Sequence, residues 1–371
     1  MRGRTEQQPT MFVMINMEAR VPSDHPLRAI KKRCAVILKA LRQDFDAAYS
    51  RIGRPSIPPE QLLKAMLLQA LYSIRSEIQL MQAIEFNLLY RWFLDIPGDA
   101  VVWTPEVFSM NRERFAKHDL VRKFFDRIVS DAMTEELVSS DHFTADGTLI
   151  RSWASLKSLV PKDGKRRTED DDPGNRTVNF HHEKRTNATH QSATDPDALL
   201  ARKGKGKEAH LCHSGHVVME NRHGLCLAVG VDAADGHAER RMTKRLLKQL
   251  RKRHRLRPKT LGLDAGYDDG AFLVELERCD IVPHVPVRSG EIKATGPPGD
   301  ARRRALRQKN KKGFQMSQRI RKRVEEIFGW FKGVGGLART RFVGRWKIEL
   351  QMLAVAAAYN LLRLARLRPA V

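Results

Sequence analysis

Three acidic residues of this 371-residue chain stand where an acid is unusual. Asp146 lies in the middle of a predicted strand, Asp264 at the end of another, and Glu325 on a predicted helix rich in Lys and Arg. An Asp inside a strand has poor β-propensity and is costly to bury unless it is paired or bound to a metal. Three carboxylates on adjacent elements can hold two Mg²⁺ ions, or Mn²⁺ as a substitute, about 3.5 to 4 Å apart for phosphodiester chemistry. The pattern therefore indicates Asp146, Asp264 and Glu325 as metal ligands and catalytic residues.

Each acid also has an ordinary structural explanation. Asp146 and Asp264 precede Gly147 and Gly266, and Asp side chains commonly close turns of this kind. Glu325 could pair with Arg321, four residues earlier on the same predicted helix. Taken one at a time the acids fit these roles, whereas all three together, on this order of predicted strands, favour the metal site.

Positive charge is concentrated in the C-terminal half. The chain has 67 Lys and Arg against 43 Asp and Glu, a net charge of +24, and 42% hydrophobic residues, as expected for a protein with a buried core. Residues 240–259 hold 11 Lys or Arg and no acid, residues 301–347 hold 16 against two acids, and the rest is close to neutral. A localised basic surface indicates a polyanion as partner, with nucleic acid the leading candidate. The alternative is a solvated helix face without a partner.

The elements that would carry these residues fall into two groups. The first part of the chain predicts an all-helical unit, with helices from Pro59 to Ser73, from a capping box at Ser76 towards Tyr90, from Thr104 to Phe115, and from Asp119. Short helices suit a helix-turn-helix-like DNA-binding unit, and small bundles with no nucleic-acid role are equally consistent.

After Ser140 the pattern predicts a mixed α/β sheet. The expected order is a strand, a hairpin, a helix, a strand, a helix, a strand and a closing helix, at 142–150, 211–220 with 225–231, 239–253, 261–264, 270–278, 281–287 and 319–333. Two polar stretches, 161–206 and 288–318, are expected to lack regular structure. The expected domains are a helical one over 1–138, a mixed-sheet one over 139–347 with the polar loop 161–206, and a C-terminal helix over 348–371.

Several classes of protein are excluded by the sequence. The four cysteines form no C-x-x-C pair, and four histidines near one of them match no standard zinc spacing, so neither a disulfide framework nor a zinc site is expected. These residues are Cys34, Cys212, Cys226, Cys279, His181, His182, His213 and His216. The N-terminus has no apolar signal segment and the longest apolar run, 350–362, is too short to span a bilayer, so we expect an intracellular protein with no membrane partner.

The residues around the three acids resemble a known family, the bacterial insertion-sequence transposases of the DDE class, in the group named after insertion sequence five. Segments 145–158 (ADGTLIRSWASLKS) and 263–268 (LDAGYD) are similar to the family's first and second Asp motifs. Arg321, Glu325 and Lys332 reproduce the Arg-Glu-Lys part of its third motif, and this spacing selects Glu325 over Glu326. Gln318 stands where that motif has Tyr.

The similarity extends upstream, so that it runs from about residue 51 to residue 345. The segments that resemble the family's N-terminal helical domain are 53–60, 71–76, 87–93 and 108–112. The resemblance implies an α/β protein in which a ribonuclease-H-like catalytic domain is preceded by an all-helical domain that recognises the terminal inverted repeats.

The resemblance also implies an activity. Asp146, Asp264 and Glu325 would hold two Mg²⁺ ions and catalyse cleavage of transposon ends and transfer of the released 3′-hydroxyl to target DNA. The phosphates of this double-stranded DNA would be held by Arg321, Lys332, Arg319 and Arg323, and more generally by the runs 240–259 and 302–323. The protein would act in the bacterial cytoplasm, at the nucleoid, as a homodimer or larger assembly on paired ends. Two alternatives are an end-binding relic that acts as a repressor and a nuclease of the same fold without strand transfer.

Overall fold

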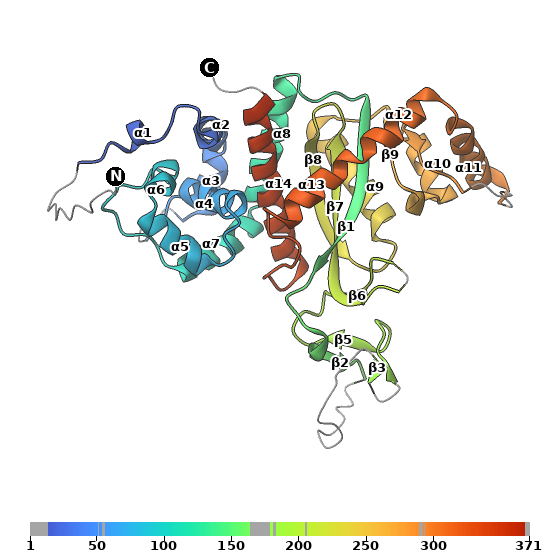
Figure 1. Ribbon diagram of the computed structural model, residues 1–371, viewed down its shortest axis with the longest axis horizontal. Coiled ribbons are helices and arrows are strands. Elements are labelled where there is room, and N and C mark those ends of the chain that lie inside the picture. The colour runs from blue at the N-terminus through green and yellow to red at the C-terminus, as the bar shows by residue number, and fades with distance from the viewer. Residues whose placement is uncertain are drawn as a thin grey trace, which may run out of the picture.

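The computed structural model describes residues 14–50, 52–53, 56–163, 179–180, 183–204, 206–288, 292 and 294–367. Figure 1 shows a long helix, α14 (Arg345–Leu367), with the N-terminal helices on one side of it and a β-sheet on the other. The chain therefore returns at its C-terminus to lie between its two main parts.

The N-terminal part is entirely helical in its described residues, as expected. Its helices are α1 (Met17–Arg20), α2 (Pro26–Ala40), α3 (Arg42–Ala48), α4 (Pro59–Leu71), α5 (Glu77–Phe86), α6 (Leu88–Leu94), α7 (Pro105–Lys117) and α8 (Leu120–Thr134). The capping box of Ser76 and Gln79 is present at the start of α5. The single helix expected from Ser76 to Tyr90 is wrong, because the side chain of Asn87 accepts a hydrogen bond from the Leu89 backbone and starts a new helix there.

The main sheet contains each strand expected along the chain after Ser140. Its path is β10 (Val282–His284), β9 (Thr260–Gly262), β1 (His142–Arg151) and β7 (His210–Glu220), and both β8 (Leu225–Ala233) and β6 (Leu199–Ala201) pair with β7. Strand β1 is antiparallel to β7 and parallel to β9, and β9 is parallel to β10. The β7–β8 hairpin is confirmed, whereas β9 and β10 are shorter than expected.

Both faces of this sheet are covered. Every side chain of β7 from Leu211 to Glu220 is buried, and successive side chains of a strand point to opposite faces. Helix α9 (Ala238–His254) packs on β7 and β8, and α14 packs on β8. The apolar stripe predicted for α9, from Met242 to Leu250, is buried. The sheet is thus the middle layer of the fold, with helices packed against it.

Helix α14 joins the sheet to the N-terminal helices. It begins at Arg345 and has 23 residues, more than the apolar run 350–362 suggests, and by length and composition it could cross a membrane. However, 72% of its most apolar window is buried within the protein. It packs on α2, α4 and α8 as well as on β8, so that one hydrophobic core runs through both parts of the chain.

The polar stretch 288–318 does contain regular structure, contrary to expectation. It forms α11 (Gly296–Gln308) and most of α12 (Lys312–Arg321), and α13 (Arg323–Lys332) follows, so the single closing helix expected over 319–333 is also divided. Pro297 and Pro298 begin α11 instead of a turn, because the first turn of a helix does not use their missing N–H groups. Bidentate hydrogen bonds from Arg302 to Asp268, at 2.7 and 2.8 Å, hold α11 against the segment before α10 (Gly270–Arg278).

The polar stretch 161–206 also contains regular structure, contrary to expectation, and its residues 164–178, 181–182 and 205 lie outside the described part of the chain. One of its strands, β5 (His190–Ser192), pairs with β2 (Leu159–Pro161), the strand that follows the short helix η1 (Leu156–Ser158). Two others, β3 (Asn179–Phe180) and β4 (Glu183–Lys184), pair with each other. Asp195 is fully buried and accepts hydrogen bonds from Ser152 Oγ at 2.6 Å and from the Gly344 backbone at 3.3 Å. This contact attaches the stretch to the start of α14.

Candidate active site

Asp146 and Asp264 are carried by neighbouring strands of the main sheet. Asp146 is in β1, and Asp264 follows β9, which runs parallel to β1. Asp146 Oδ1 accepts a hydrogen bond from Gly147 N and Asp264 Oδ1 accepts one from Gly266 N, each at 2.8 Å. Asp264 therefore closes the turn Ala265–Tyr267, whereas the turn considered for Asp146 is wrong, because β1 continues through Gly147, which pairs with His216 of β7. One oxygen of each carboxylate is occupied, and Asp146 Oδ2 faces Arg321.

Helix α13 brings Glu325 to the same region. The helix contacts β1, and Glu325, in its first turn, is exposed. The pairing of Glu325 with Arg321 considered from the sequence is wrong, because α12 ends at Arg321 and the Nη1 of this arginine lies 3.2 Å from Asp146 Oδ2. One cation therefore joins the C-terminal helices to the acid of β1, across 175 positions of sequence.

A fourth carboxylate, Glu239, stands between the two aspartates. A Cβ added to Gly266 would lie 3.2 Å from Glu239 Oε2 and 3.1 Å from Asp264 Oδ1, and one added to Gly147 would lie 3.2 Å from Glu239 Cγ. Glycine at both positions therefore leaves room for this side chain. Sequence reasoning placed Glu239 at the start of a basic helix, where an acid is common because it faces the positive end of the helix dipole. The only sign of a special role in the sequence was that this acid comes directly before a run of 11 basic residues that contains no other acid.

The acids affect one another's protonation. Burial raises the pKa of Asp146 to about 6, and the charges of Asp264 and Glu325 add to that effect, against the hydrogen bond from Gly147 and the charge of Arg321. Burial also raises the pKa of Glu239 to about 7, with further contributions from Asp264 and Asp146. Several partly buried carboxylates in one place repel each other, which a cation between them would relieve.

The donor set fits a hard divalent cation such as Mg²⁺ or Mn²⁺, because it consists of carboxylate oxygens. Asp146, Asp264, Glu239 and Glu325 are the residues that would hold it. In the described residues no three Asp, Glu, His or Cys side chains are grouped closely enough to enclose an ion. The ion pair of Asp146 with Arg321 occupies one of the oxygens concerned.

Replacing Glu239 with Gln is expected to stabilise the protein in the presence of chelator, and only at higher pH. The pKa of Glu239 rises from about 4.5 to about 7 on folding. The folded state thus keeps a proton that the unfolded chain releases. The contribution of the protonated Glu239 to the free energy of unfolding is therefore fully present below about pH 4.5 and is lost as the pH rises through about 7. The melting temperature of E239Q should exceed that of the wild type at pH 8, and the difference should vanish towards pH 4.5.

The control for this comparison is Glu326→Gln, at an exposed position on α13. It should follow the wild type at every pH. Adding Mg²⁺ at pH 8 should raise the melting temperature of the wild type more than that of E239Q. A difference between E239Q and wild type that does not change with pH would contradict the position given to Glu239.

Two contacts hold the segment that carries Asp264. Gln318 Nε2 donates to the carbonyls of Leu263 at 3.2 Å and His284 at 2.7 Å, which ties α12 to the ends of β9 and β10. Gln318, where the family has Tyr, is thus a positioning residue. Tyr267 is fully buried and its hydroxyl accepts a hydrogen bond from Thr243 of α9 at 3.2 Å. Because it is enclosed, Tyr267 is not available as a nucleophile.

The four basic residues singled out near Glu325 have different surroundings. Arg319 is exposed on α12, and Arg321 pairs with Asp146. Arg323 Nη1 donates to the Asn221 carbonyl at 3.1 Å and so ties α13 to the β7–β8 turn. Lys332 is half-buried, and this burial and the nearby charge of Lys203 lower its pKa. The structure therefore does not place all four on one open helix face.

The basic run 240–259 is partly neutralised within the protein. Six of its side chains form ion pairs, namely Arg240 with Asp269, Arg241 with Asp232 and Asp235, Lys244 with Glu275, Arg253 with Asp126, Arg257 with Asp280, and Lys259 with Asp141. The exposed side chains without an acidic partner in the described residues are Arg245, Lys248, Arg251, Lys252 and Arg255. The surface that this run offers to a polyanion is therefore narrower than its composition suggests.

The histidines considered for zinc have separate places. His213 Nε2 lies 2.9 Å from Asp195 Oδ2. His216 pairs in register with Gly147, and burial lowers its pKa to about 4. His181 and His182 lie outside the described residues.

Comparison with known families gives two matches. Residues 15–114 match a transposase domain, and residues 179–361 match the transposase DDE domain. Asp264, Glu325 and Glu239 lie within the second match, whereas Asp146 precedes it. No curated protein matches the chain, and no solved structure does. The DDE domain implies a ribonuclease-H-like fold, with which the mixed sheet β8-β7-β1-β9-β10 agrees.

Proposed function

This chain belongs to the DDE-class insertion-sequence transposases, and from that premise we propose that it binds the ends of its own insertion sequence and catalyses their cleavage and transfer to target DNA. One observation supports the proposal most. Acids that are far apart in the sequence come together, since a Cβ added to Gly266 would lie 3.1 Å from Asp264 Oδ1 and 3.2 Å from Glu239 Oε2, and Asp146 lies in the strand paired with β9. Carboxylates gathered beside a basic surface are suited to phosphodiester chemistry with divalent metals.

Asp146, Asp264 and Glu325 are the proposed catalytic residues and metal ligands, and Glu239 is added to them. Bound Mg²⁺ or Mn²⁺ would supply Lewis acidity, lowering the pKa of an attacking water or 3′-hydroxyl and stabilising the leaving oxygen. Arg321 holds Asp146 in place, and its guanidinium can move to a phosphate oxygen when DNA and metal arrive. Exposed Arg319 and half-buried Lys332 would hold neighbouring phosphates, and Arg323 would contribute less because it donates to Asn221.

The remaining assignments follow from the same proposal. The helices of residues 1–138 would recognise the terminal inverted repeats, residues 139–347 would carry out catalysis, and the C-terminal helix would link them. Transposition joins two ends, so a homodimer or larger assembly on paired ends is proposed. The place of action would be the bacterial cytoplasm, at the nucleoid.

The proposal is tested with labelled duplex DNA carrying the end of the element, incubated with Mg²⁺, with Mn²⁺ or with chelator. We expect a cut at the end that releases a 3′-hydroxyl, depends on the metal, and is followed by joining to a target plasmid. Binding without a cut would contradict the proposal in favour of a repressor. Cutting at the end without joining would contradict strand transfer and favour a nuclease.

A further inference from the structure

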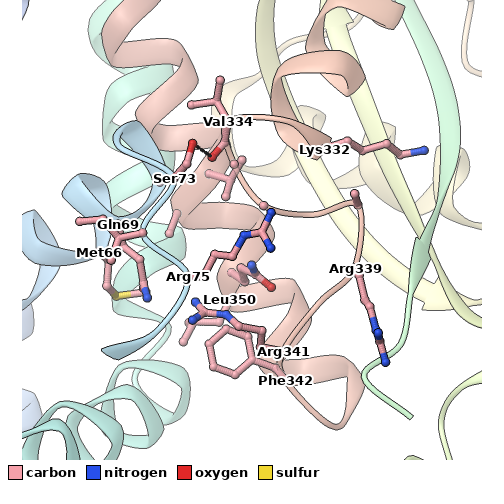
Figure 2. Close-up of a pocket in the computed structure, with 18 of the residues that line it drawn as sticks. Met66, Gln69, Ser73, Arg75, Lys332, Val334, Arg339, Arg341, Phe342 and Leu350 are labelled. Carbon is pink, nitrogen blue, oxygen red and sulfur yellow. Dashed lines mark hydrogen bonds between the residues drawn. The ribbon is translucent and has the colours of Figure 1, made fainter. Parts of the chain in front are cut away.

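A cavity lies where the N-terminal helices meet the segment after α13. Its volume is about 330 Å³, within the range of small-ligand sites. It is lined by the end of α4, by α7, by the loop of residues 333–342 and by α14. Figure 2 shows the hydrogen bond that closes it on one side, donated by Ser73 Oγ to the Val334 carbonyl at 2.9 Å. Both parts of the chain therefore build this site.

The lining of the cavity carries positive charge alone. Its charged members are Arg75, Arg112, Lys332, Arg339 and Arg341, and it contains no Asp or Glu. Its other side chains are largely apolar, such as Met66, Phe108, Leu350 and Val355. A lining that combines cations with apolar side chains suits an anion that carries an organic group.

These cations differ in the number of ion pairs and hydrogen bonds that they form within the protein. Arg112 forms an ion pair with Glu77 and stacks on Phe342 at 4.6 Å, and Arg339 donates to the Trp153 carbonyl at 3.0 Å. Arg75 and Arg341 have no acidic partner in the described residues. Figure 2 shows them reaching the same space from different segments.

Arg75 and Arg341 also repel each other. Burial lowers the pKa of Arg341, and the charge of Arg75 adds to that effect. Arg75 is exposed and Arg341 is half-buried, and cations near each other repel until a ligand brings negative charge. A phosphate group would neutralise this pair of cations, because it accepts hydrogen bonds from several arginines at once.

We propose that this cavity binds one backbone phosphate of the DNA strand, held by Arg75 and Arg341, with the attached sugar against its apolar side chains. The inference rests on the proposed function in taking DNA as the ligand. Neither residue belongs to the Arg-Glu-Lys motif, and Arg75 lies outside both basic runs. The bound phosphate would also join the N-terminal helices to the catalytic part.

The separation between this cavity and the carboxylates predicts where along the DNA the bound phosphate lies, counted from the cut. Lys332, at the edge of the cavity, is seven residues after Glu325 on α13, which is about 10 Å of helix. Trp153, which also lines the cavity, is seven residues after Asp146, a length of chain that spans at most about 23 Å. With about 3.4 Å per nucleotide along a strand, the phosphate should lie about three to seven nucleotides from the cut.

The test compares the wild type with R75A/R341A on one duplex, by affinity across a range of salt concentrations. The double variant should bind about tenfold more weakly at moderate salt, and its slope of log affinity against log salt should be smaller by about 0.9, the value for one phosphate. The matched control is R42A/R127A, which removes two exposed arginines from helices α3 and α8 that do not line the cavity. The variant R75K/R341K keeps both positive charges and should retain the wild-type slope. The smaller slope of the alanine variant would then be due to the lost charges and not to the change of side chain at these positions.

The position is tested by replacing single phosphates with neutral methylphosphonates along each strand. One substitution three to seven nucleotides from the cut should weaken binding of the wild type and leave binding of R75A/R341A unchanged. If the alanine variant keeps the wild-type slope while the wild type binds and cuts the same DNA, this inference fails and the proposed function stands. If the wild type binds the end but does not cut it, the proposed function fails and the salt slopes still decide the inference.

Discussion

Glu325→Gln is expected to abolish cleavage of the element's end while leaving the DNA bound. The exposed Glu325 has no partner among the described residues, so the substitution should not disturb the fold. Glutamine keeps the shape and loses the charge that would hold a metal ion. A loss of about 4 kcal/mol of transition-state stabilisation corresponds to a rate lower by about a thousandfold. Binding should be unchanged or slightly tighter, because one negative charge leaves a basic surface.

The neighbouring residue supplies the control. Glu326 is also exposed in the first turn of α13, so Glu326→Gln removes the same charge one position away. It should cut at the wild-type rate. The measurement is single-turnover cleavage of labelled DNA with Mg²⁺, together with affinity in chelator. Equal rates for E325Q and wild type, or a loss confined to E326Q, would contradict the assignment of Glu325.

Asn360→Ala is expected to cause a large loss of stability. Asn360 is 2% exposed on α14, and its amide pairs with both backbone groups of Cys226 in β8, accepting from N at 2.9 Å and donating to O at 2.7 Å. Alanine would leave two buried backbone groups unpaired, at about 1 to 3 kcal/mol each. The free energy of unfolding should fall by roughly 2 to 5 kcal/mol.

The measurement is thermal unfolding followed by circular dichroism, in which the variant should melt several degrees below the wild type. Arg366→Ala, an exposed position on the same helix, is the control and should melt with the wild type. Because α14 contacts both the sheet and the N-terminal helices, both parts should lose stability together. Equal melting of N360A and wild type would contradict the role given to this amide.

Helix α11 and the division at Asn87 were missed for different reasons. Helix α11 lacks a strong apolar stripe that would predict it, and ion pairs such as that of Arg304 with Glu277 of α10 hold it in place. Ion pairs of this kind depend on residues that the chain brings together only after folding. The division at Asn87 had a local signal, a capping residue, which the continuing apolar period concealed.

The sequence by itself determined the motif acids and those elements that have a clear local signal. Apolar periods and caps act over a few residues, so the β7–β8 hairpin, the buried stripe of α9 and the capping box at Ser76 were all predictable. The strand patterns placed Asp146 inside one strand and Asp264 at the end of another, and Glu325 was selected by the spacing of its motif. These features need no knowledge of distant contacts.

Tertiary structure alone decided what surrounds those acids. Glu239 lies near Asp146 and Asp264 only because α9 packs on the sheet, and Arg321 reaches Asp146 rather than Glu325 because the chain divides between α12 and α13. Arg75 and Arg341 share a cavity although 266 positions separate them in the sequence. The physical reason is that electrostatic interactions depend on distance in space, which for such pairs is set by the packing of whole elements.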